Sequence, residues 1–139
     1  MSASISITSW RPWSIGLVLV FLASISMLTP GCRSAPVRDM GPTSIPSTSP
    51  ERVNKTIHIA GASLGWVMKE QSPGLIVATL TLRDHLAVVE IPYSATSFSI
   101  RYKDSQNLRY NADDRSIHSN YNGWVQNLNN AILAGLSVP

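Results

Sequence analysis

The chain has 139 residues, 44% of them hydrophobic, with 11 basic and 8 acidic side chains and a single cysteine, Cys32. This length suits one modest domain, and one thiol excludes both an intramolecular disulfide framework and a cysteine-based structural zinc site. The formal net charge of +3 is spread along the chain, without the clustered lysines and arginines that nucleic-acid binding requires. We therefore expect no nucleic-acid partner.

The N-terminal region has the layout of a secretory signal peptide. An uncharged, mostly apolar run spans residues 14–28, with Arg11 before it and Thr29-Pro30-Gly31-Cys32 after it. A membrane-spanning helix needs about 20 apolar residues, and this run is shorter and ends at a Pro-Gly breaker. An uncleaved membrane anchor is the alternative interpretation.

The only cysteine directly follows the small residue Gly31, and this arrangement resembles the lipobox of bacterial lipoproteins. The resemblance implies that Cys32 is the lipid-attachment residue, that residues 1–31 are removed, and that the mature chain keeps 108 of the 139 residues. It departs from the commonest pattern, because Leu28 lies four residues before the cysteine rather than three. The alternative is a free thiol behind an ordinary signal peptide.

Residues 32–50 are expected to form a tether between the acylated cysteine and the folded domain. The stretch is rich in Pro, Ser and Thr and shows neither helical nor strand periodicity. Such a composition buries too little apolar surface to offset the entropy of ordering, and its prolines keep it extended. We expect it to hold the domain away from the membrane.

Residues 51–139 are expected to form the folded domain, which opens with a helix. Ser49 is suited to cap that helix, Pro50 to occupy its first position, and Glu51 to stabilise its first turn. Apolar residues then recur at helical spacing as far as Leu64, and we expect the helix to end near Ser63.

Alternating strands and short reversals come next. The reversals are Pro73-Gly74, Arg83-Asp84-His85 and residues 94–96, with strands starting near Trp66 and ending near Lys103. Residues 104–118 are polar and predict a loop, after which Ser119 is suited to cap a last helix. The fold class is α+β: an N-terminal helix, a three- to four-stranded antiparallel meander and a C-terminal helix, both helices packed on one face of the sheet.

Several short sequence phrases run through most of this folded region. They are Gly65-Trp66, Pro73-Gly74, Ala78-Thr79-Leu80, Arg83-Asp84-His85, Ser99-Ile100-Arg101-Tyr102, Asp104-Ser105, Asn107-Leu108 and 117–124, which reads Ile-His-Ser-Asn-Tyr-Asn-Gly-Trp. Together they resemble a group of small, uncharacterised proteobacterial lipoproteins. The resemblance implies a Gram-negative envelope and a short α+β domain, with no assigned activity. Arg33 directly after the cysteine implies sorting to the outer membrane rather than the inner membrane.

The sequence contains no nucleophile elbow, no zinc-protease helix and no phosphate loop or dinucleotide fingerprint. We therefore predict no catalytic residue, no metal site and no cofactor. The three histidines, His58, His85 and His118, have no local metal-ligand spacing. An acid–base pair is the alternative, with His85 beside Asp84 or His118 near the acidic residues at 113 and 114. The simpler interpretation is that His85 and His118 hydrogen-bond backbone groups at turns.

A binding face is predicted where polar residues project from one strand of the sheet. It comprises Ser99, Arg101 and Lys103, with Asp104, His85 and His118 at its margins. Two cations on an open sheet face suit an anionic glycan, a lipid headgroup or a partner protein. The alternative is a solvated face whose charges discourage aggregation. Trp66 and Trp124 are expected in the core rather than on this face.

Three functional hypotheses follow from these patterns. The first is a membrane-anchored envelope lipoprotein with a small non-enzymatic binding or accessory domain and an envelope protein or glycan as partner. The second is a small periplasmic enzyme that uses His85 or His118 with a nearby carboxylate. The third is an anchored subunit of a larger assembly, which would expose an apolar patch. The oligomeric state is left open.

Overall fold

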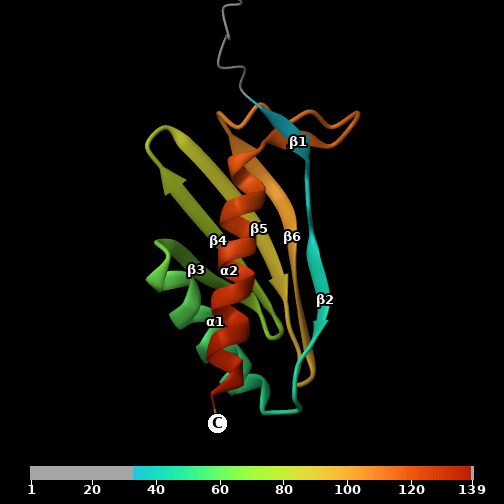
Figure 1. Ribbon diagram of the computed structural model, residues 1–139. Coiled ribbons are helices and arrows are strands. Elements are labelled where there is room, and N and C mark those ends of the chain that lie inside the picture. The colour runs from blue at the N-terminus through green and yellow to red at the C-terminus, as the bar shows by residue number, and fades with distance from the viewer. Residues whose placement is uncertain (1–32, 139) are drawn as a thin grey trace, which may run out of the picture. The chain divides into compact units, whose positions relative to one another are not determined.

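A computed structural model of the chain describes residues 33–138, and Figure 1 shows their arrangement. In chain order the elements are β1 (Ser34–Pro36), β2 (Met40–Ser44), α1 (Pro50–Ser63), β3 (Trp66–Ser72), β4 (Leu75–Leu82), β5 (His85–Pro92), β6 (Ser97–Gln106), β7 (Ser116–His118) and α2 (Asn120–Ser137). The predicted signal peptide and Cys32 lie outside the described residues.

The strands form two sheets, so the expected single meander of three to four strands is wrong. Five strands form an antiparallel sheet in the order β2-β6-β5-β4-β3, and β1 pairs with β7 in a separate two-stranded sheet. Strands β3 to β6 follow one another across the large sheet, as short reversals require. The additional strands are short, and two of the three come from the segment before α1.

The segment expected as a tether supplies β1 and β2. Strand β2 lies at the edge of the large sheet, where prolines are tolerated, and its register against β6 shifts between Met40 and Thr43. This irregularity hides the period-two pattern by which a strand is recognised. Gly41 has φ +90°, and an added Cβ would lie 2.8 Å from the Phe98 carbonyl oxygen, so the close approach of β2 to β6 requires glycine.

The first helix of the described residues is consequently a mid-chain element and not the N-terminal element that we expected. Its start is as predicted: the Ser49 side chain accepts a hydrogen bond of 3.2 Å from the Arg52 amide, and Pro50 opens the first turn. It buries Val53 and Ile57 and ends where Gly65 adopts φ +82°.

The expected loop over 104–118 is shorter in the structure, because β6 continues to Gln106 and β7 occupies Ser116–His118. A register shift between Val88 and Val89 places an extra β6 residue at Lys103. The alternation of side chains is broken there, which explains why the end of this strand looked aperiodic in the sequence.

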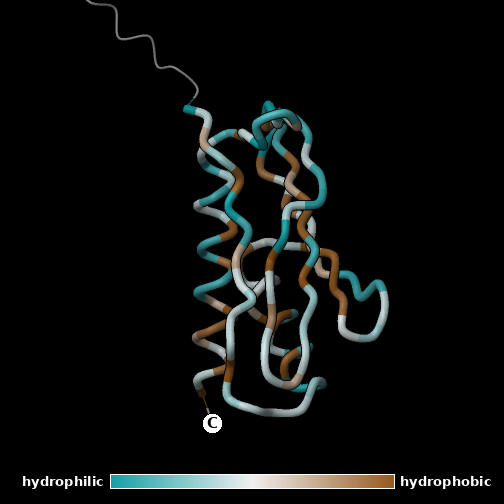
Figure 2. The backbone as a smooth tube through the Cα atoms, turned by 90° about the vertical axis from the view of Figure 1, so that its right-hand side faces the viewer, coloured by the Kyte–Doolittle hydropathy of each residue, from teal (hydrophilic) through white to brown (hydrophobic). Residues whose placement is uncertain are grey.

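One face of the large sheet and both helices share the hydrophobic core. The fully buried side chains come from β4 to β7, from the β6–β7 connection and from both helices, and the largest are Tyr121, Phe98, Ile57, Ile76, Ile91, Ile100, Leu108, Ile117, Leu128 and Ile132. Both helices lie on this face in Figure 1, and Figure 2 shows α2 running lengthwise beside the strands. Trp66 is buried as predicted, whereas Trp124 is only partly buried. Within residues 33–138, neither helix is both long and apolar enough to cross a bilayer.

Candidate functional site

The fold brings together two histidines that are distant in sequence. His85 opens β5 and His118 ends β7, and their ring centroids are 5.8 Å apart. The Trp124 ring, from the second turn of α2, lies 6.4 Å from the His85 ring. No local spacing in the chain indicates this pairing, because it depends on β7 and on the β6–β7 connection. His58 lies apart from the pair on α1.

Each of the two histidines is oriented by a backbone hydrogen bond. His85 Nδ1 lies 3.0 Å from the Asn107 carbonyl oxygen, while the Asn120 amide donates to His118 Nδ1 at 3.2 Å. The first contact requires a proton on Nδ1 of His85, since a carbonyl only accepts, and the second requires a lone pair on Nδ1 of His118. In the neutral rings, His85 Nε2 is therefore a hydrogen-bond acceptor and His118 Nε2 a donor.

Asp84 is the carboxylate nearest to this pair. Its Oδ1 lies 3.7 Å from His85 Nε2, and its side chain is 74% exposed. Asn107 fixes the turn by donating from Nδ2 to the Asp84 carbonyl oxygen at 2.6 Å. Since Asp84 is well solvated, a charged His85 would gain only a small attraction from it. The other two carboxylates named in the prediction belong to the β6–β7 connection, and Ser116 hydrogen bonds lower the pKa of the Asp114 carboxyl.

The residues predicted to form one binding face are divided between three places. His85 has the same strand parity as the buried Ala87, so it belongs to the helix side of the sheet, whereas Arg101 pairs with Glu90 on the open side. Lys103 forms an ion pair with Glu90, and Asp104 is exposed nearby. Ser99 is buried. The six residues therefore do not form one surface.

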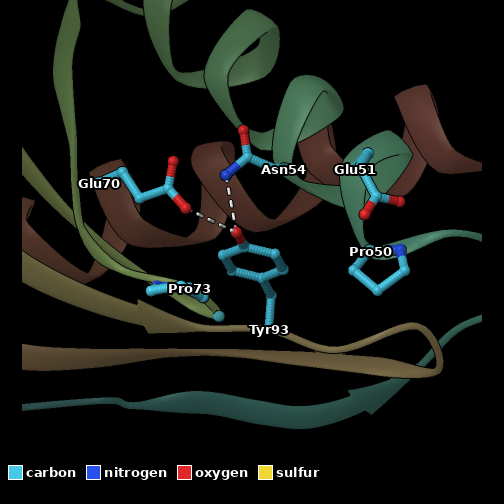
Figure 3. A pocket seen from close by; sticks show the side chains of 7 residues that line it. Pro50, Glu51, Asn54, Glu70, Pro73 and Tyr93 are labelled. Atoms are coloured by element: carbon cyan, nitrogen blue, oxygen red, sulfur yellow. Dashed lines mark hydrogen bonds between the residues drawn. The ribbon is translucent and has the colours of Figure 1, made fainter.

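A cavity of about 320 Å³ lies at the end of the sheet opposite to the histidine pair, and the sequence did not indicate it. Figure 3 shows its Tyr93 hydroxyl between the α1 side chain Asn54 and Glu70 of β3. Asn54 Nδ2 donates to the phenol oxygen at 2.7 Å, and the phenol donates to Glu70 Oε1 at 3.4 Å. Glu51 and the rings of Pro50 and Pro73 complete the wall. These residues come together only because the start of α1 and the β3–β4 turn are neighbours in the fold.

Asp39 joins the segment before α1 to the rest of the domain. Its carboxylate accepts from the Tyr102 amide at 2.9 Å and from the Arg115 guanidinium at 3.0 Å. The Tyr102 ring contacts the Tyr121 ring edge-on, and burial raises the pKa of both phenols above the usual value. This cluster stabilises the position of β2, and the sequence did not single out Asp39.

The hypothesis of a subunit in a larger assembly requires an exposed apolar patch, and some apolar side chains are exposed. Ile59 is 60% exposed beside a groove of about 260 Å³ between α1 and α2, and Val67 is 70% exposed on β3. They belong to different elements, and neither identifies an occupant. Among residues 33–138, there is no group of three or more metal-ligating side chains.

Comparisons with protein-family models, with curated proteins and with solved structures gave no match. The resemblance to small proteobacterial lipoproteins therefore stays a prediction from the sequence phrases.

Proposed function

We propose that the protein is an envelope lipoprotein, anchored through an acylated Cys32, whose domain is a small non-enzymatic binding or accessory module. The observation that carries the proposal is the position of the only cysteine, directly after an apolar segment and Gly31. A mature chain that began at Cys32 would keep every element of the described domain, since β1 starts at Ser34. Two or three acyl chains give stable membrane attachment, whereas one gives only marginal binding.

The setting that follows is the periplasm-facing surface of a Gram-negative membrane, with the outer membrane favoured because Arg33 follows the cysteine. An envelope protein or a glycan is the proposed partner. The Tyr93 cavity supports a binding role: it offers one aromatic ring, two carboxylates and one amide to a small polar group.

Metabolic labelling with a palmitate analogue in a Gram-negative host tests the anchor, with intact mass as the second measurement. We expect label on the wild-type chain, a mass without residues 1–31, and no label on Cys32→Ser. The matched control is the double variant Cys32→Ser/Ser34→Cys, which moves the thiol by two residues and should stay unlabelled. An unlabelled wild-type chain would overturn the proposal.

The histidine pair favours a second candidate, a periplasmic enzyme that uses acid–base chemistry. The supporting observation is the complementary hydrogen bonding of the two rings, with His85 Nε2 as acceptor and His118 Nε2 as donor. Hydrolysis of nitrophenyl ester and phosphodiester model substrates would test it. A true acid–base pair predicts a loss of about 100-fold or more in His85→Gln or His118→Gln, with His58→Gln unchanged as the matched control. Equal rates in all three variants would exclude this candidate for those substrates.

A further inference from the structure

The chain is held firmly to the domain from the residue that directly follows Cys32. The Ser119 amide donates to the Arg33 carbonyl oxygen at 2.8 Å, and β1 pairs with β7 in the register Ser34 to His118. The Val37 amide then donates to the Arg115 carbonyl oxygen, also at 2.8 Å. Because this bonding begins at Arg33, no length of free chain lies between Cys32 and the domain.

The same hydrogen bonds define one end of the domain, which we call the anchor end. It consists of Arg33 and β1, the turn at 83–85, the segment 107–109 and His118–Ser119. The His118 amide donates to the Leu108 carbonyl oxygen at 2.9 Å, and Asn107 holds the turn through the Asp84 carbonyl oxygen at 2.6 Å. In Figure 1 this end carries β1 and lies opposite to the C-terminal end of α2.

We infer that acylation of Cys32 seats the anchor end directly on the phospholipid headgroups, so that the domain has a fixed orientation on the membrane. The inference rests on the proposed function. Consecutive Cα atoms are about 3.8 Å apart, so a lipid on Cys32 is attached within one peptide unit of the bonded Arg33 carbonyl. The membrane is therefore the occupant of this surface, and the expectation that a tether holds the domain off the membrane is replaced.

The side chains at the anchor end suit a phosphate-bearing surface. Arg33, Arg83 and Arg109 are exposed, and none of them pairs with a carboxylate of the described residues. Guanidinium groups bind phosphate oxygens with two parallel hydrogen bonds. Asp84, Asp113 and Asp114 lie in the same turn and connection, so net charge does not drive the contact. The lipid anchor supplies the proximity, and the arginines supply hydrogen bonds to individual headgroups.

Energy transfer from single tryptophans to headgroup-labelled lipid measures this orientation. After removal of residues 1–31, Trp66→Phe leaves Trp124 near the anchor end as the only tryptophan. The matched reporter is Trp66→Phe/Trp124→Phe/Thr96→Trp, which places the donor in the exposed β5–β6 reversal at the far end. Both acylated proteins are reconstituted in vesicles of phosphatidylethanolamine and phosphatidylglycerol that carry dansyl-phosphatidylethanolamine.

We expect transfer from Trp124 to exceed that from the far-end reporter several-fold. Insertion of a flexible Gly/Ser linker of about 15 residues between Cys32 and Arg33 should reduce this difference. In the linker background, Arg83→Gln/Arg109→Gln should reduce the difference further, with the double variant Lys55→Gln/Lys69→Gln as the charge-matched control. Equal transfer from both positions in a protein whose mass shows the acyl chains would overturn the orientation alone, whereas a protein without acyl chains would overturn the proposed function.

Hydrogen exchange provides a measurement that needs no substitution. On vesicles, amides at 107–111 of the acylated wild-type protein should exchange several-fold more slowly than in detergent, while amides at 94–97 should not change. Equal exchange of both segments in the two environments would count against a membrane-seated anchor end, even if the tryptophan variants failed to fold.

Discussion

Asn54 of α1 donates a hydrogen bond of 2.7 Å from Nδ2 to the hydroxyl oxygen of Tyr93, which lies just after β5. The bond joins the first turns of the helix to the large sheet, 39 residues away along the chain. The Tyr93 amide also donates to the Gly74 carbonyl oxygen at 2.9 Å. Tyr93 therefore connects α1, the β3–β4 turn and the end of β5, and it forms the floor of the cavity at that end.

Tyr93→Phe should lower the free energy of unfolding by about 1 kcal/mol, because it leaves the half-buried Asn54 amide without its acceptor. Urea denaturation measures the change. Glu70→Gln is the matched control: an amide oxygen still accepts from the phenol, and the original contact is long at 3.4 Å, so little change is expected. Equal effects of the two substitutions would show that the Asn54 bond does not contribute.

The two helices differ in how their first turns are capped, and this difference gives a second prediction. Ser49→Ala removes the hydrogen bond to the Arg52 amide and should cost about 1 kcal/mol. Ser119→Ala should cost much less, because the Ser119 side chain makes no capping hydrogen bond and His118 Nδ1 accepts from the Asn120 amide instead. Thermal unfolding of the two variants would compare them. A larger loss for Ser119→Ala would contradict this assignment of caps.

Elements with a regular local pattern could be predicted from the sequence, and elements without one could not. The cap at Ser49 and the alternation from Ile76 to Leu80 are local, and the helix start and the β4 strand follow from them. Strand β2 has an edge position, a proline and a register shift, so its pairing with β6 depends on tertiary contacts such as Asp39 to Tyr102. The two-stranded sheet was missed because three residues are too few to show a period.

The candidate site shows the same limit. From their positions near turns, we expected His85 and His118 each to hydrogen-bond a backbone group. The structure confirms both bonds. Their approach to each other could not be derived from local spacing, since it needs the β6–β7 connection to return His118 to the start of β5. The burial of one residue of the predicted face, Ser99, has a related reason. The burial of Ser99 comes from a neighbouring strand, β2, that the sequence did not reveal.

Two glycines of α2 should respond oppositely to alanine. At Gly123 an added Cβ meets nothing within 4 Å. Gly123→Ala should therefore raise the free energy of unfolding by about 0.5–1 kcal/mol, because alanine gives the unfolded chain less backbone entropy than glycine does. At Gly135 the added Cβ would lie 2.6 Å from Cγ2 of Thr56, whose β-branched side chain moves little, so Gly135→Ala should destabilise the packing of α2 on α1. Chemical denaturation of both variants decides this, and stabilisation by Gly135→Ala would mean that the helices separate at little cost.

Tyr121 provides a fourth prediction, because its hydroxyl is fully buried and has no hydrogen-bond partner among the described residues. An unpaired buried hydroxyl costs about 1–3 kcal/mol, so Tyr121→Phe should leave stability unchanged or raise it by about 1 kcal/mol. Tyr102→Phe is the comparison, since the Tyr102 hydroxyl pairs with the Ser105 hydroxyl at 2.9 Å and its loss should destabilise the domain.

The pH dependence of stability follows from the same burial. Because burial raises the pKa of Tyr121 in the folded state, the unfolded chain loses the phenol proton first, at about pH 10. Ionisation of Tyr121 therefore leaves stability unchanged below about pH 10 and lowers it progressively as the pH rises above that value. Denaturation series between neutral and strongly alkaline pH should show a steeper alkaline decline for the wild-type chain than for Tyr121→Phe. Parallel curves would mean that Tyr121 ionises as readily in the folded domain as in the unfolded chain.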